Sequence, residues 1–265
     1  MHASLLSTSH RPWPLPPSQW KWRQSWLDLA FIHYRASSRE IRSLLPEGVN
    51  LQKYDGSAWI GLVPFRMSGV MRRPMPDIPL LSSFPELNLR TYVEVDGEAG
   101  VWFFSLDAAS LPMVFGGRLL YGLPYYYSKM SHRRQDDWID FSSSRKRSQV
   151  EFSARYRPVG DTFQSPAGTF EHWATERYCL YTTSAKGALE RIEVHHQPWP
   201  IQKAEVEIER CDLFQSAGIT LEDQLPVCHF SSGVNVVSFR KEETSQALDA
   251  IPAGQTSASA LAKTS

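Results

Sequence analysis

Short stretches in which apolar residues alternate with polar ones, or run together, recur along most of the chain. They are rich in β-branched and aromatic residues and are separated by Gly, Pro, Asp or Asn, which is typical of β-strands joined by turns. Between two of them, Asp96-Gly97 has the composition of a tight hairpin turn. We predict strands at residues 27–34, 58–67, 88–95, 101–106, 125–132, 138–144, 149–156, 178–183, 189–195, 201–208 and 234–239.

Helical patterns are few. Ser37 or Ser38 can cap a short helix over residues 37–45, and Pro46 ends it. Weaker signals predict helices at residues 110–120, 166–174 and 211–217. Strands and helices do not alternate as they do in a doubly wound parallel sheet. The pattern therefore predicts an α+β protein that is mainly antiparallel β, with a large sheet that is curled or closed.

The two ends of the chain differ from this strand-rich body. Residues 1–20 hold several prolines, which disfavour helix, and we expect them to form an extended arm. Trp13 and Trp20 indicate that the arm lies against the body. Residues 241–265 are rich in Ser, Ala, Thr and Gln, which predicts a disordered tail. A single domain is thus expected over residues 21–240.

Composition narrows the range of partners. Lysine plus arginine and aspartate plus glutamate are equal at 28 each, which gives no broad charged surface for nucleic acid. No stretch reaches the length of a membrane span, and the N-terminus lacks a signal-peptide pattern. Cys179, Cys211 and Cys228 are widely spaced and odd in number, as in reduced proteins. We expect a cytoplasmic protein that binds neither nucleic acid nor membrane, and assembly into a homo-oligomer is left open.

Common nucleotide and nucleophile signatures are absent: the chain has no GxGxxG, no Walker-type loop and no GxSxG. His195 and His196 are neighbours in a predicted strand and so point to opposite faces, which speaks against a shared metal ion. We expect one of them to face solvent and the other to hydrogen-bond inside. Cys179 lies in an apolar strand and is expected to be a core thiol. The sequence predicts no metal site and no cofactor.

One predicted strand carries a polar face that is the best candidate site. Glu86, Asn88, Arg90 and Tyr92 alternate with Leu, Thr and Val, so their side chains share one face. In an open sheet this face would meet water, whereas in a closed barrel it would line the interior. The first three of these residues are therefore candidates for binding a ligand.

A buried arginine on such a face needs a carboxylate partner. Glu86 with Arg90, or Glu176 with Arg118, would meet that need and would also make a pocket for anions. Taken alone, each pair is more typical of a structural ion pair than of a catalytic set.

Eight segments of the chain form a familiar series: LPEGVNL at 45–51, YDGSAWIG at 54–61, VPFRM at 63–67, FPELNLRTYV at 84–93, GVWFFSLD at 100–107, LPYY at 123–126, TERY at 175–178 and HHQPW at 195–199. In this order they resemble a bacterial family of unknown function, the YqjF-like family. The match runs over about residues 24–239, and the arm and tail lie outside it. The resemblance implies a fold but no activity.

This family in turn resembles, at a distance, the acetoacetate decarboxylase-like superfamily, which implies an antiparallel cone or barrel around a pocket. Those enzymes attack a ketone with a lysine in a Gly-x-Pro-Lys-Lys-like motif. Here the matching residues are Tyr125 and Tyr126, which cannot form an imine. Lys129 would lie roughly 10–13 Å further along a strand. Glu86 matches the pocket glutamate of the superfamily, and whether the protein is an enzyme is left open.

Three hypotheses follow. In the first, the protein binds a small organic acid or carbonyl compound without Schiff-base decarboxylation. In the second, it is a lysine-independent acid–base enzyme of the hydratase, dehydratase or enolisation type, with Glu86 or Glu176 as base. In the third, it is a structural or partner-binding protein that has no pocket. The predicted ligand-binding residues are Glu86, Asn88, Arg90, Arg118, Tyr125, Tyr126 and Arg177.

Overall fold

The strands of the chain join into one continuous sheet. The computed structural model describes residues 2–76 and 82–244. The strands are β1 (Trp22–Ala36), β2 (Asn50–Leu51), β3 (Ala58–Arg72), β4 (Phe84–Val95), β5 (Glu98–Ala108), β6 (Tyr125–Gln135), β7 (Trp138–Arg145), β8 (Glu151–Phe163), β9 (Cys179–Thr183), β10 (Leu189–His196), β11 (Ile201–Cys211), β12 (Val227–Ser238) and β13 (Glu242–Glu243). The helices are the 3₁₀ helix η1 (Ala3–Leu6) and the α-helices α1 (Ser38–Ser43), α2 (Leu111–Tyr121), α3 (Phe170–Thr175) and α4 (Leu213–Ser216).

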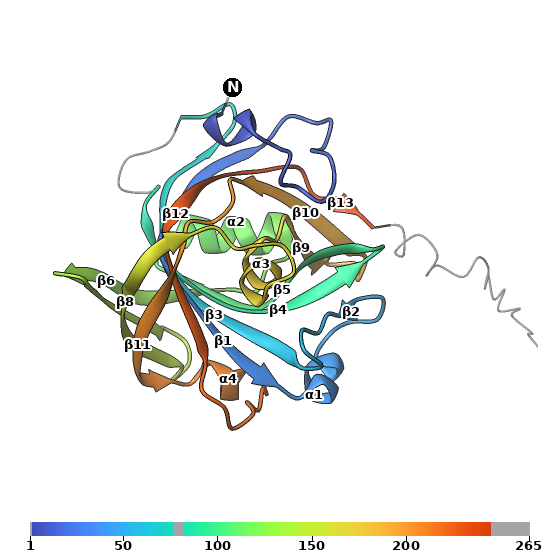
Figure 1. The fold of residues 1–265 in the computed structure, drawn as a ribbon. Helices are drawn as coiled ribbons and strands as arrows, with labels where there is room; N and C mark the ends of the chain where they lie inside the picture. Colours follow the sequence, from blue (N-terminus) through green and yellow to red (C-terminus); the bar gives the residue numbers. More distant parts are fainter. Residues whose placement is uncertain (1, 77–81, 245–265) are drawn as a thin grey trace, which may run out of the picture.

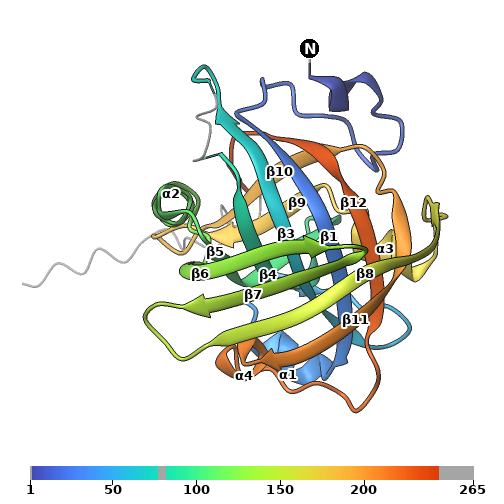
Figure 2. The same ribbon diagram turned by 90° about the vertical axis from the view of Figure 1, so that its left-hand side faces the viewer.

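Within the described residues the sheet has 13 strands in the order β13-β10-β9-β5-β6-β7-β8-β11-β12-β1-β3-β4-β2, with additional pairings of β10 to β12 and of β4 to β5. These additional pairings curl the sheet back on itself, as Figure 1 shows from one end. Helices α2 and α3 lie at opposite ends of the curl (Figures 1 and 2). The expected antiparallel, cone-like architecture is confirmed.

Part of the sheet folds over the rest as a second layer. In Figure 2, β6, β7, β8 and β11 run across β1, β3 and β12 at a steep angle. The main hydrophobic core fills the space between these layers, where side chains such as Phe141 and Phe152 meet Ile32, Ile60 and Leu62. Burial of these apolar side chains is the main stabilising contribution of this part of the fold.

The opposite face of β1, β3 and β4 packs on a second apolar cluster inside the curl. This cluster contains Phe31, Phe65 and Phe84 together with Trp199. Strand β4 is therefore buried on both faces, and every residue from Glu86 to Val93 is buried. A strand covered on both sides loses the clean contrast between inner apolar and outer polar positions that sequence patterns rely on.

Every predicted strand and helix overlaps an observed one, and the hairpin at Asp96-Gly97 forms with positive φ at both residues. The strands are longer than predicted at some ends: β1 begins at Trp22 and β12 at Val227. Two contacts are parallel rather than antiparallel, since β5 pairs with β6 and with β9 in parallel. Helix α2 makes the crossover between β5 and β6, a local βαβ unit that the sequence analysis did not anticipate.

The ends differ in part from the expected arm and tail. The arm includes the 3₁₀ turn η1 as well as extended chain, and it lies on the body near β10 and β12. Arg11 is buried there and pairs with Glu193 at 2.7 Å. The tail predicted from residue 241 begins instead with β13, which pairs with β10. Residues 245–265 lie outside the described part of the chain. Among the residues that are described, no helix has the length and apolarity needed to span a membrane.

Candidate functional site

A cavity of about 350 Å³ lies inside the curl, bounded by β1, β3, β4, β5, β10 and α2. Its wall is largely apolar and aromatic, with a few buried polar groups, as is common for small-molecule sites. The apolar wall includes Trp22, Trp26, Phe31, Phe65, Met67, Phe84, Phe103 and Trp199. The polar wall includes Gln24, Glu86, Asn88, Arg90, Tyr125, Thr175, Arg177 and His196.

Strand alternation on β4 places three of the predicted residues on this wall. Glu86, Asn88 and Arg90 line the cavity, while Leu87 and Leu89 between them point into the main core on the other face. These three residues share one face, as predicted, and of the two environments that the sequence left open, water or the interior of a closed sheet, the structure has the interior.

Glu86 and Tyr125 form a buried pair on the cavity wall. The Tyr125 hydroxyl donates a hydrogen bond to Glu86 Oε2 at 3.2 Å, and the glutamate is 2% exposed. Burial, with a smaller effect from the negative charge of Asp107, raises the pKa of Glu86 to about 8 against the lowering effect of this hydrogen bond. The side chain is therefore mainly a neutral carboxylic acid at pH 7.

Asp107 has its own partners on the side away from the cavity. Its carboxylate accepts from Arg145 Nε at 2.9 Å and from the hydroxyls of Ser128 at 3.0 Å and Ser143 at 3.1 Å. This buried ion pair holds β5 to the β6–β7 hairpin. It also fixes a negative charge near Glu86, which favours the neutral form of the glutamate.

Two buried guanidinium groups, those of Arg90 and Arg177, line the cavity near the end that α3 covers. Arg177 donates to Trp173 O and to Gln52 Oε1, both at 2.6 Å, and Arg90 donates to Ala174 O at 3.4 Å. Both groups lie against the Tyr92 ring, Arg90 at 5.6 Å and Arg177 at 5.2 Å from its centroid.

Neither of these arginines forms an ion pair with a carboxylate of the described residues, and the expected pairing of Glu86 with Arg90 does not occur. Arg90 Nε and Arg177 Nη2 are buried and have no hydrogen-bond partner there. Burial lowers the pKa of Arg177 to about 10, and the Arg90 charge lowers it too, against the raising effects of Tyr92, Cys179 and the more distant carboxylate of Glu94. Arg177 thus stays charged at neutral pH, with capacity left for an anion.

The second expected ion pair, Glu176 with Arg118, is also absent. Glu176 accepts from the Trp199 backbone N–H at 2.9 Å and from the Tyr178 hydroxyl, so it fixes the chain after α3. Arg118 donates from Nε to Tyr125 O at 2.5 Å, from the outer side of α2. Neither Glu176 nor Arg118 is on the cavity wall. The sequence did not predict this, because it does not reveal how the helices that carry or precede these residues are oriented on the sheet.

The consecutive tyrosines 125–127 at the start of β6 point to alternate faces of the sheet, as the two-residue period of a strand predicts. Tyr125 points into the cavity, and Tyr126 points outward, where it is 37% exposed and lies over Arg145 at 3.9 Å. Tyr126, predicted to bind ligand, is therefore a surface residue. Tyr127 packs against the edge of the apolar cluster inside the curl.

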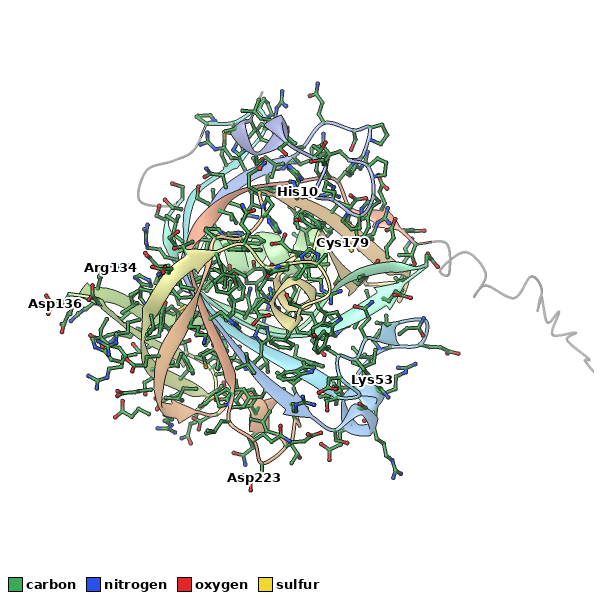
Figure 3. The ribbon with its side chains drawn as sticks, viewed as in Figure 1. His10, Lys53, Arg134, Asp136, Cys179 and Asp223 are labelled. Atoms are coloured by element: carbon green, nitrogen blue, oxygen red, sulfur yellow. The ribbon has the colours of Figure 1, made fainter. Side chains whose placement is uncertain are left out.

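The cavity wall carries no lysine from the described residues. Lys53, for example, lies at the periphery of the molecule in Figure 3. Cys179, labelled inside the ring of strands, is buried, and burial raises its pKa to about 12. It carries a neutral thiol, as expected of a core cysteine.

The expectation that one of His195 and His196 faces solvent is wrong, since both are buried. They do point to opposite faces: His196 lines the cavity, whereas His195 Nε2 lies 2.6 Å from Ser4 O of the arm. The arm covers a face that would otherwise meet water. His10 of the arm, labelled in Figure 3, stacks there on His195 with 5.4 Å between the ring centroids. No group of three metal-ligating side chains occurs among residues 2–76 and 82–244.

The sequence analysis missed the part of the wall that comes from β1 and the end of β3. Gln24 and Trp26 lie on a segment assigned no strand, and Met71 and Met75 follow the predicted end of the β3 strand. The concentration of methionines at 67–75 was the available signal, because unbranched thioether side chains often line adaptable apolar sites.

Comparison with known proteins identifies the family of the chain. The model of the DUF2071 family, whose members are described as uncharacterized conserved proteins, matches residues 23–235. The chain belongs to the DUF2071 family. The uncharacterized DUF2071-type relative YqjF from Bacillus subtilis is 39% identical over 224 residues, which are 84% of this chain and 92% of YqjF. The YqjF-like resemblance seen in the sequence is confirmed.

Solved structures show the fold that this DUF2071 protein shares. Acetoacetate decarboxylase from Legionella pneumophila aligns with a TM-score of 0.62 at 13% identity, over 89% of this chain and 93% of that chain. The enduracididine biosynthesis enzyme MppR, in a complex with pyruvate, gives a TM-score of 0.62 at 14% identity, over 86% and 91%. An acetoacetate decarboxylase-like enzyme from Sphingomonas wittichii RW1 gives 0.56 at 13%, over 87% and 97%. The acetoacetate decarboxylase-like fold is thus confirmed.

Proposed function

We propose that this DUF2071 protein binds a small organic acid non-covalently in its cavity, with the acid's carboxylate held by Arg90 and Arg177. The observation that carries the proposal is the pair of buried guanidinium groups that line the cavity without a carboxylate partner in the described residues. An uncompensated buried charge is costly, and a ligand carboxylate would supply the missing partner. Arginine suits this role because its planar group can donate two parallel hydrogen bonds to one carboxylate.

A second set of polar groups would bind an oxygen elsewhere on the ligand. Glu86 is mainly a neutral acid at pH 7 and can donate to a carbonyl or hydroxyl oxygen. Asn88 lies between Glu86 and Arg90 along β4, and its buried side-chain oxygen has no partner. A ligand hydroxyl near the carboxylate would satisfy both groups, because it can accept from Glu86 and donate to Asn88 Oδ1, whereas a ligand carbonyl would satisfy Glu86 alone.

The fold relatives are consistent with such a ligand, since MppR has been solved with pyruvate bound. The absence of a lysine from the described cavity wall favours reversible binding over imine formation. The cavity also counts against a purely structural role without a pocket.

Calorimetric titration with pyruvate, acetoacetate and hexanoate tests the proposal. We expect saturable binding to the wild-type protein and a loss of about 10- to 100-fold in affinity in Arg90→Gln and in Arg177→Gln, the range for hydrogen bonds to a charged group. Arg147→Gln, at an exposed turn position, is the matched control and should bind as wild type does. Native mass spectrometry of protein purified from cells gives an independent readout, because a tightly held acid would co-purify. Equal affinities for wild type and both cavity variants would refute the proposal.

A second candidate is acid–base catalysis on the bound acid, and the carboxyl group of Glu86 favours it. A buried group on a cavity wall with a pKa of about 8 exists in both protonation states near neutral pH. Its ionised form could take a proton from the carbon beside a ligand carbonyl, and its neutral form could return it. Proton NMR in D₂O would show exchange of the methyl protons of pyruvate, and exchange that persists unchanged in Glu86→Gln would eliminate this candidate.

A further inference from the structure

The cavity has two chemically different ends. The guanidinium groups of Arg90 and Arg177 mark the end covered by α3, next to Thr175. At the other end the wall is formed by α2, by the first residues of β1 and by the last residues of β3. Figure 2 shows α2 and α3 on opposite sides of the sheet, in agreement with this division.

Methionine is concentrated at the α2 end. The chain has 6 methionines, and Met67, Met71, Met75 and Met113 all line the cavity. Met67 is buried, whereas Met75 is 55% exposed, so the cavity opens to solvent on this side. Unbranched, polarizable thioether side chains accommodate apolar ligands of varied shape.

Strand register separates the two ends along β4. Met67 on β3 pairs with Phe84 at the start of β4, and Gly61 on β3 pairs with Arg90. Six residues of extended strand between Phe84 and Arg90 correspond to roughly 20 Å. An acid of three or four carbons anchored at Arg90 would therefore leave the methionine end without contact. The volume of about 350 Å³ is equivalent to roughly twelve molecules of liquid water, well above the need of such an acid.

We propose that the ligand is a monocarboxylate with an extended apolar body, an aliphatic chain of about twelve to sixteen carbons, which is long enough to extend over most of the roughly 20 Å between the two ends. Its carboxylate binds Arg90 and Arg177, and its apolar end lies among Met67, Met71 and Met113. This inference rests on the proposed function and adds the class of acid. It makes the methionine end the part of the site that sets chain-length specificity.

A chain-length series tests the inference. The sodium salts of butanoate, hexanoate, octanoate and dodecanoate are titrated into the full-length protein by calorimetry, with 1-dodecanol as a neutral probe of the same length as the longest acid. Each added methylene buried against the apolar wall should improve the affinity by about fourfold, as expected for its removal from water. Dodecanoate should bind more tightly than 1-dodecanol, and Arg177→Gln should remove that difference.

Two variants locate the specificity. Met67→Gln and Met71→Gln should weaken dodecanoate binding by about tenfold and leave butanoate binding unchanged. Met71 is only partly buried, so its substitution tests the inference even if Met67→Gln fails to fold. Met130→Gln is the matched control, because Met130 packs against the core between the sheet layers rather than on the cavity.

The possible failures are distinguishable. Acids of all lengths that bind equally well, but depend on Arg177, would overturn the inference on chain length and leave the proposed function standing. No binding of any acid, or dodecanoate and 1-dodecanol binding alike in the wild type, would overturn both.

Discussion

The raised pKa of Glu86 predicts that the protein loses stability as the pH rises. The folded state holds this proton with a pKa of about 8, against an ordinary value of 4.5 for a solvated glutamate. Between these two values the folded state binds more protons than the unfolded state, so the free energy of unfolding falls with rising pH. The stabilising effect is complete below about pH 4.5 and is lost above about pH 8.

The size of the effect follows from the same two values. Each unit of pKa difference corresponds to about 1.4 kcal/mol, so the whole shift corresponds to about 5 kcal/mol as an upper bound. This is a large part of the stability of an ordinary domain. In Glu86→Gln the group no longer titrates, while its amide keeps the shape of the neutral carboxyl and its oxygen can still accept from Tyr125. The two proteins should therefore have similar stability at pH 5 and diverge as the pH rises to 9.

Urea unfolding at pH 5, 6, 7, 8 and 9 measures this difference directly. We expect the stability of the wild type minus that of Glu86→Gln to fall steadily over the series, so that the variant is the more stable protein at high pH. Glu207→Gln is the control, since Glu207 is exposed and its pKa is lowered by Arg155 rather than raised. Parallel stability curves for wild type and Glu86→Gln would refute the reasoning.

Two further predictions concern packing and charge. A Cβ at Gly117 would lie 2.3 Å from the Tyr125 ring, so Gly117→Ala should cost about 1–3 kcal/mol and weaken ligand binding. A Cβ at Gly116 would have no other atom within 4 Å, so Gly116→Ala should stabilise α2 by about 0.5–1 kcal/mol. Thermal unfolding would show this contrast between the two variants, and equal effects on stability would contradict the packing described. Arg11→Ala should cost about 1–3 kcal/mol in urea unfolding, because it removes one of the two arginines that pair with the buried Glu193 and leaves Arg191 at 3.2 Å. The double variant Arg11→Met/Glu193→Met should recover most of this loss, and a single-variant cost below 1 kcal/mol would show that the arm does not bind as described.

Much of the fold was predictable because β-strand alternation and turn residues are local signals. The hairpin at Asp96-Gly97 and the shared face of Glu86, Asn88 and Arg90 needed only the strand period. The start of β1 was missed because Trp22–Trp26 mixes polar and aromatic residues and is held in place by long-range pairing with β3 and β12. Such pairing leaves no periodic trace in the sequence.

The site was predictable only in part, and the errors share a cause. Glu86, Asn88, Arg90, Tyr125 and Arg177 line the cavity as expected, since each lies on a strand or next to one. Arg118, Tyr126 and Glu176 do not, because their directions depend on how α2 and α3 join the sheet. His195 is buried for a related reason, namely that an arm distant in sequence covers its face.

Strand β4 is a partition one residue layer thick between the cavity and the main core. A substitution there alters the ligand wall or the core, and a shift of its register by one residue would exchange the two. The strand is therefore a poor place for a family to acquire new ligand preferences. The wall formed by the start of β1 and the end of β3 does not also support the main core, since the last residues of β3 are partly or fully exposed. Under the proposed function, differences in ligand choice among DUF2071 proteins are accordingly expected at the methionine end of the cavity rather than on β4.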